Sequence, residues 1–362
     1  MLNNPARLEI CRRCRIKHMA WFATFLGLMP NLLWAQSDFY RGKLLTLIQD
    51  STPGGVGQLR TQALIPVLQK HIPGNPKIVI QFMPGAGGRT AANHLYNNAP
   101  RDGLTIGRVS SGLVTAAILG LPGVQYEIYK FIYLGSGHNE VNNVFFSRSQ
   151  LGLDNLNKLK AATGLRIGGQ SVGHSNYVIA RLFAWLLDLK DPKFVVGFSG
   201  AEMDVGLLQG ELDARANSAE TIVQRTPDFI NKRLMNFHGV AEIPHGFRYD
   251  HPAFRELPAL HTFGRTEKEE RVLEMFAAFG RFSQAFVLPP GTPDDRVKIM
   301  KDAYRKSLKD PEFHENWKKM TRADASPLMP EELEELIKTI PRDPEDVKLY
   351  NMLAGAEPLP KR

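Results

Sequence analysis

Thr52-Pro53-Gly54-Gly55-Val56-Gly57 and Met83-Pro84-Gly85-Ala86-Gly87-Gly88 are two glycine turns in the first third of the chain. Each turn follows an aliphatic run, 44–49 or 77–83, that predicts a strand. Each turn also precedes a segment whose sequence predicts a helix. A glycine-rich turn from strand to helix presents bare backbone N–H groups, which can bind an anion. The two turns either serve only as tight turns or form a pocket for a small negatively charged molecule, and their occurrence together favours the pocket.

The first 35 residues have the pattern of a secretory signal. A basic start, 7–17, precedes an almost wholly apolar run, 19–33, and the segment ends in Leu33-Trp34-Ala35. This pattern predicts cleavage after Ala35 and export to the periplasm. The alternative is an uncleaved anchor, but the run is about 15 residues long with Pro30 inside it, short of the roughly 20 that a spanning helix needs.

Loss of the signal changes what the composition implies. Five Lys/Arg and one Glu leave with residues 1–35, so the net charge falls from +8 to about +4. That charge carries no nucleic-acid signature, and we expect no nucleic-acid partner. Cys11 and Cys14 also leave, so the mature chain has neither a disulfide nor a thiolate.

The rest of the chain alternates strands and helices and predicts an α/β protein with two lobes built on parallel, helix-covered sheets. We expect the first lobe to comprise 36–142 plus 281–362 and the second 143–280, with crossings near Asn142–Asn143 and near Phe279–Phe282 and the C-terminal helices packed on the first lobe. Locally, Pro66 is expected to kink or split its helix, and Thr90 and Thr292 are expected to N-cap theirs. With two facing lobes, the glycine turns and the loop 169–174 would line one cleft.

The glycine turns do not match nucleotide-binding motifs. The dinucleotide fingerprint that would begin at Gly85 requires glycine where Thr90 stands, and neither turn ends in Gly-Lys-Ser/Thr. We also expect no metal and no cofactor, because the sequence contains no His-Glu-x-x-His, no EF-hand loop and no paired Cys/His ligand set.

Gly169-Gln170-Ser171-Val172-Gly173 matches the G-x-S-x-G pattern of hydrolases in a strand–turn–helix context, which makes Ser171 a candidate nucleophile. Acids and histidines follow in a suitable order, but such residues occur in almost any chain of this length, and no His-Gly-Gly segment precedes the serine. A secreted serine hydrolase is therefore the alternative to a helix start that binds an anion through N–H groups and hydroxyls. His174 is either a ligand contact or an ordinary loop histidine.

Several segments, in order along the chain, resemble the Bug (TctC-like) family of periplasmic binding proteins of tripartite tricarboxylate transporters. Besides the stretch from Leu44 to Gly88, the matching segments are Pro100-Arg101-Asp102-Gly103-Leu104-Thr105-Ile106-Gly107, Gly210-Glu211-Leu212-Asp213-Ala214, Pro289-Pro290-Gly291-Thr292-Pro293 and Asp310-Pro311-Glu312-Phe313.

The resemblance implies a two-lobed Venus-flytrap fold of the type II class. It implies a non-enzymatic receptor that captures a small carboxylate, or an aromatic or amide relative, for a membrane transporter. Carried over from the family, the ligand contacts are expected at Thr52, Gly55, Val56, Gly57, Gln58, Gly85, Ala86 and Gly87 in the first lobe, and at Gln170, Ser171, His174, Ser175, Phe198, Ser199, Gly200, Asn217, Ser218 and Ala219 in the second.

The sequence departs from the family at two of these places. The first turn ends Val56-Gly57-Gln58 in place of Gly-Thr/Ser-Asp, and Phe198-Ser199-Gly200 replaces Tyr-Lys-Gly, which removes a cation. We expect ligand specificity to differ at Gln58. We expect a monomer, and a receptor that serves a sensor kinase remains an alternative to one that serves a transporter.

Overall fold

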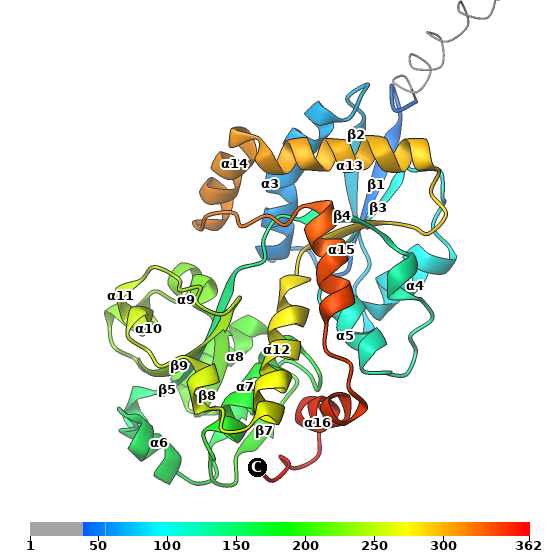
Figure 1. Ribbon diagram of the computed structural model, residues 1–362. Helices are drawn as coiled ribbons and strands as arrows, with labels where there is room; N and C mark the ends of the chain where they lie inside the picture. The colour runs from blue at the N-terminus through cyan, green and yellow to red at the C-terminus, as the bar shows by residue number, and fades with distance from the viewer. Residues whose placement is uncertain (1–38, 55) are drawn as a thin grey trace, which may run out of the picture.

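The computed structural model describes residues 39–54 and 56–362. The predicted signal peptide, its cleavage site at Ala35 and the predicted contact Gly55 lie outside the described residues. Two five-stranded sheets organise the rest, one in each half of the molecule (Figure 1).

The first sheet has the order β2-β1-β3-β10-β4. Its strands are β1 (Leu44–Gln49), β2 (Lys77–Phe82), β3 (Thr105–Val109), β4 (Ile132–Ser136) and β10 (Ala285–Leu288). The helical segments of this half are α3 (Val56–His71), η1 (Ala86–Gly88), α4 (Arg89–Asn97), α5 (Gly112–Ile118), η2 (Ile128–Lys130), α13 (Asp294–Lys309), α14 (Pro311–Thr321) and α15 (Pro330–Thr339).

The second sheet has the order β7-β6-β8-β5-β9. Its strands are β5 (Val141–Arg148), β6 (Arg166–Gly168), β7 (Lys193–Val195), β8 (Ala214–Ser218) and β9 (Met235–Ile243). The helical segments of this half are η3 (Ser149–Leu151), α6 (Leu156–Ala161), α7 (Ser175–Leu186), α8 (Gly200–Gln209), α9 (Ala219–Arg225), α10 (Asp228–Asn231), α11 (Pro252–Arg255), η4 (Leu260–Phe263) and α12 (Glu267–Arg281).

Both sheets are mixed, so the expectation of purely parallel sheets is wrong. β1 is parallel to β2 and β3, and β6 is parallel to β7 and β8, but β10 runs antiparallel to β3 and β4, and β5 runs antiparallel to β8 and β9. The reversed strands β5 and β10 are those by which the chain enters a sheet from the other half. Such a strand runs away from the point where the chain crosses between the two halves, whereas the neighbouring strands run toward that point.

Helix α3 is continuous through Pro66, contrary to the predicted split. Pro66 is exposed, as is Gln62, whose carbonyl loses its intrahelical donor and can bond to water. The opposite face of α3 buries Leu64, Val67 and Leu68, and α13 and α14 pack against it. Burial of that face outweighs the missing hydrogen bond.

The two predicted threonine caps are also wrong. α4 begins at Arg89 after Gly88, whose φ of 94° is accessible to glycine at little cost, so Thr90 lies inside the helix. The hydroxyl of Thr292 donates to the carbonyl of Pro289 at 2.8 Å, and Pro293 occupies the N-cap position of α13.

A further helix, α16 (Pro344–Ala354), was missed by the sequence analysis and packs against α7 and α12 of the second half (Figure 1). The chain thus passes from the first half to the second a further time, after α15. The lobe boundaries stay a prediction. The contacts of α16 with the second half do not fit the expectation that all of 281–362 belongs to the first lobe.

Candidate functional site

The carboxyl ends of β1, β2 and β3 meet at one edge of the first sheet, because the three strands are parallel. The same edge receives the chain from the second half, since Ala285 at the start of β10 pairs with Val109 at the end of β3. In the second sheet, Asn143 near the start of β5 likewise pairs with Ser218 at the end of β8. The carboxyl edges of both sheets therefore lie on the side where the chain crosses between them.

The second glycine turn lies at the first-lobe edge, as predicted. Gly85 and Gly87 have φ of 137° and 64°, and the turn leads directly into α4. A Cβ at Gly88 would lie 2.8 Å from a carboxylate oxygen of Asp50. That carboxylate also accepts the N–H of Ser110 at 2.6 Å. The residues that follow β1, β2 and β3 are thus packed together.

The first glycine turn is fastened by its own helix. The side-chain oxygen of Gln58 accepts the N–H of Gly54 at 2.7 Å, which resembles the backward reach of a capping box. Thr52 is exposed, and Val56 begins α3. Gln58 therefore takes over part of the role of the capping group that the sequence lacks here.

Arg108, at the end of β3, is a buried cation that sequence reasoning missed. It is 3% exposed, its Nη1 lies 3.3 Å from Oδ1 of Asp50, and it also donates to Gln284. Burial lowers the pKa of Arg108, and the charge of Asp50 partly opposes this shift. A Cβ at Gly57 would lie 3.0 Å from Nη2 of Arg108, so glycine at this position lets the turn approach the guanidinium.

The predicted second-lobe residues lie at or just beyond the carboxyl ends of three neighbouring strands, β6, β7 and β8, where each strand leads into a helix. His174, Ser199 and Ser218 are the N-caps of α7, α8 and α9. The two serine hydroxyls accept N–H groups at 3.3 and 3.2 Å. The remaining predicted residues at these strand ends and helix starts are Gln170, Ser171, Ser175, Phe198, Gly200, Asn217 and Ala219.

Ser171 has no catalytic partner in the part of the chain that the structure describes. Its side chain makes no hydrogen bond there, to a histidine or to any other group. The nearest histidine in sequence, His174, accepts the N–H of Asn176 on its Nδ1 at 3.3 Å. Burial lowers the pKa of His174, so the imidazole is neutral at neutral pH. Nothing in this geometry activates the serine.

Phe198 lines a cavity of about 460 Å³ together with Ala201 and Val205 of α8. Neither Arg108 nor the glycine turns line this cavity.

An ion pair joins the two halves at their carboxyl edges. Arg60, in the second turn of α3, donates to the carboxylate of Glu220 in the first turn of α9. Arg60 also lies over the ring of Trp317, at 5.6 Å from its centroid. Both charged side chains are largely buried, so this pair is a contact between lobes rather than a surface ion pair.

Among the described residues, the buried nitrogen atoms near this contact that have no hydrogen-bond partner include Nε of Arg60, Nε of Arg108 and Nδ2 of Asn217. The charge of Arg60 acts on Arg108, and Asn217 lies three residues before Glu220. Buried donors normally have partners, and leaving one unpaired costs about 1–3 kcal/mol. Unpaired donors from both lobes beside backbone N–H groups are suited to an anion.

Sequence reasoning named Asn217 but neither arginine. The available signal for Arg108 was a charged residue at the end of an otherwise buried strand, 105–109. The sequence contains no such signal at Arg60, because an arginine on the polar face of a predicted helix is ordinary.

In the described part of the chain, no helix is long and apolar enough to cross a membrane. No protein-family model and no curated protein matches this sequence.

Solved structures, however, share its architecture. The periplasmic binding protein BugD is 18% identical, over 86% of this chain and 98% of its own, with a TM-score of 0.61. MatC from Rhodopseudomonas palustris, solved with malate, is 19% identical over the same shares, with a TM-score of 0.59. Another R. palustris protein, solved with adipate, is 15% identical over 86% of this chain and 97% of its own, with a TM-score of 0.60.

The chain has the fold of periplasmic binding proteins. The predicted two-lobed α/β fold class is confirmed, and the proteins that share the fold include the Bug type that the sequence motifs resemble. These neighbours are binding proteins rather than enzymes.

Proposed function

We propose that this protein is an exported receptor that binds a small carboxylate between the carboxyl edges of its two sheets and delivers it to a membrane transporter. The observation that carries the proposal is the set of unpaired buried donors on Arg60, Arg108 and Asn217, which belong to both edges. Guanidinium and amide N–H groups are suited to carboxylate oxygens, and the glycine turns add backbone N–H groups.

Two further observations support a carboxylate as the ligand. Malate and adipate, which the similar structures of R. palustris hold, are both small dicarboxylates. Arg108 and Arg60 are already neutralised by Asp50 and Glu220, so the site is suited to binding through hydrogen bonds rather than through net charge alone.

The sequence pattern and the fold support export and release to a partner. The segment 1–35 supplies the signal, and binding between two lobes makes closure depend on contacts from both. The receptor would act as a monomer without a catalytic residue. Membrane transport subunits encoded beside its gene would support the transporter, whereas a sensor kinase there would favour the alternative.

The test is calorimetric titration with a panel of mono-, di- and tricarboxylates that includes malate and adipate. We expect at least one of them to bind saturably with a stoichiometry of one. In Asn217→Asp a carboxylate replaces the amide donor, and we expect at least a tenfold loss of affinity. Asn231→Asp, the same change at an exposed residue at the end of α10, is the matched control.

The proposal fails if the folded protein binds no carboxylate of the panel. It also fails if Asn217→Asp, with an unchanged melting temperature, binds the ligand as tightly as Asn231→Asp does.

A further inference from the structure

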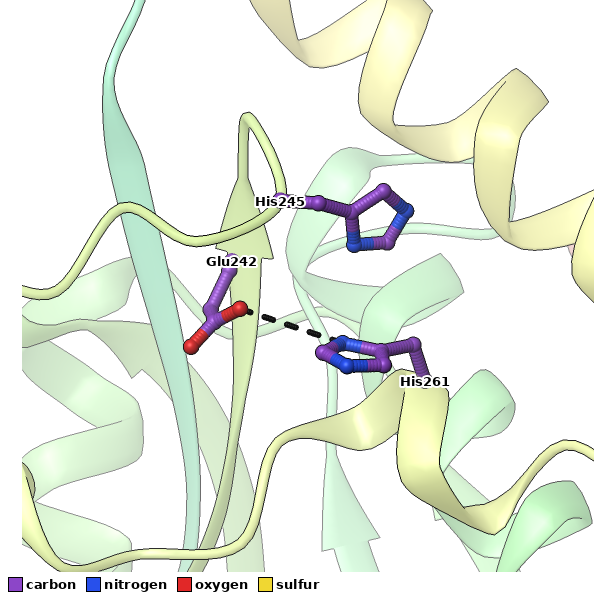
Figure 2. A group of neighbouring side chains, drawn as sticks. All are labelled: Glu242, His245 and His261. Carbon is purple, nitrogen blue, oxygen red and sulfur yellow. Dashed lines mark ion pairs between the residues drawn. The ribbon is translucent and has the colours of Figure 1, made fainter.

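Glu242, His245 and His261 meet at the carboxyl end of β9, an edge strand of the second sheet (Figure 2). Glu242 belongs to β9, His245 lies in the loop that follows, and His261 lies on η4. One potential ligand atom from each residue lies within 4.8 Å of the other two. We propose that these three residues form a binding site for one divalent transition-metal ion of the zinc type.

The distances are compatible with metal coordination after small side-chain movements. In a tetrahedral zinc site with bonds of about 2.0–2.1 Å, neighbouring ligand atoms are roughly 3.3 Å apart. Nδ1 of His261 is already 3.8 Å from Oε2 of Glu242. The ring centroids of His245 and His261 are 5.0 Å apart, and both residues are exposed. The imidazoles can therefore rotate toward a common centre.

Glu242 is the fixed member of the set. It is 8% exposed, and its Oε1 accepts from Nε of Arg248 at 2.6 Å. Oε2 accepts the N–H of Gly246 at 3.0 Å. Each carboxylate oxygen has two lone pairs, so Oε2 keeps one for a metal ion. Contacts of this kind orient a ligating carboxylate.

The donor set selects the class of metal. Two imidazoles and one carboxylate suit zinc and its neighbours in the first transition row, whereas calcium and magnesium take oxygen ligands. Three protein ligands leave a fourth position open to water or to another molecule.

The sequence analysis expected no metal, because no ligand motif is present. The structure brings residue 261 next to residues 242 and 245, across the stretch 241–258, which has few regular elements. A bound ion would connect η4 to the end of β9. We therefore expect it to stabilise the native state, since a ligand that binds only the folded chain does so.

The test is a calorimetric titration with zinc chloride of the untagged protein without residues 1–35, which contains no cysteine. We expect one zinc ion per chain and a higher melting temperature with zinc. His245→Gln and His261→Gln, both at exposed positions, should each weaken zinc binding at least tenfold. His314→Gln, an exposed histidine on α14, is the matched control and should bind zinc like the unchanged protein.

Three results would overturn the proposal: no saturable zinc binding, zinc binding that survives in either of the two variants, or equally tight binding of magnesium. Unchanged melting temperatures of the metal-free variants would confirm that they are folded.

Discussion

His238 on β9 is a buried histidine with one polar partner. Its Nε2 lies 2.8 Å from the hydroxyl of Ser147, and the residue is 3% exposed. Burial lowers the pKa of His238 from 6.5 to about 4. A neutral imidazole is therefore part of the folded core.

This lowered pKa makes stability depend on pH. The unfolded chain takes up a proton at His238 as the pH falls below 6.5, whereas the folded chain does so only near pH 4. The free energy of unfolding should therefore decrease over this window, by on the order of 3 kcal/mol from His238 alone. Urea unfolding at pH 7.5, 5.5 and 4.5 measures the loss. His238→Gln should show a shallower decrease, and an identical slope in both proteins would contradict the assignment.

Gln58 tests the first glycine turn. Gln58→Glu keeps the acceptor for the N–H of Gly54 but adds a negative charge beside the proposed carboxylate site. We expect an unchanged melting temperature and at least a tenfold weaker affinity for the carboxylate, measured by calorimetry. Gln62→Glu, one turn further along α3 and exposed, should leave the affinity unchanged. Equal affinities in the two variants would remove Gln58 from the site.

At the residue scale, the sequence predicted what depends on neighbours in the chain. The turn at Gly85 and Gly87 is visible because its conformation is encoded locally. Arg108 and Arg60 were missed because their carboxylate partners lie 58 and 160 residues away. Glu242, His245 and His261 were missed because their spacing matches no metal-ligand motif.

At the scale of elements, periodicity predicted most helices and strands, but not the direction of β5 and β10. Strand direction depends on where the chain enters each lobe, which no local pattern records. The prediction of helices stopped at residue 340, so it did not include α16.

The segment after α16 contacts α7, and its deletion tests how much these contacts stabilise the protein. Arg181 on α7 is 1% exposed and donates to the carbonyls of Leu353 and Glu357 at 2.7 and 2.6 Å. Trp185 donates to the carbonyl of Pro360 at 3.0 Å. Deletion of 356–362 should lower the free energy of unfolding by on the order of 3 kcal/mol, because it leaves part of a buried guanidinium unpaired.

Deletion of Arg362 alone is the control for this truncation. It removes the ion pair with Glu269, at 2.7 Å, but leaves the partners of Arg181 in place. Urea unfolding should show a smaller loss than the longer deletion. Equal losses would mean that the contacts of Arg181 contribute nothing measurable.

For the whole molecule, the ion pair between Arg60 and Glu220 connects the lobes without a ligand. Glu220→Gln should shift the ligand-free protein toward a more open state, because one lobe-to-lobe attraction is lost. Small-angle X-ray scattering should then give a larger radius of gyration. The exchanged pair, Arg60→Glu with Glu220→Arg, should restore much of the original value. If Glu220→Gln leaves the radius unchanged, the ion pair does not control closure.

The proposed function requires that a small carboxylate binds between the two carboxyl edges. Native mass spectrometry of the protein taken directly from the periplasm of its own cells tests it most directly. We expect one bound small molecule per chain, with at least one carboxylate in the released compound, and no such adduct on Asn217→Asp. A released ligand without an acidic group, or one that Asn217→Asp retains in full, would show that the site does not bind a carboxylate.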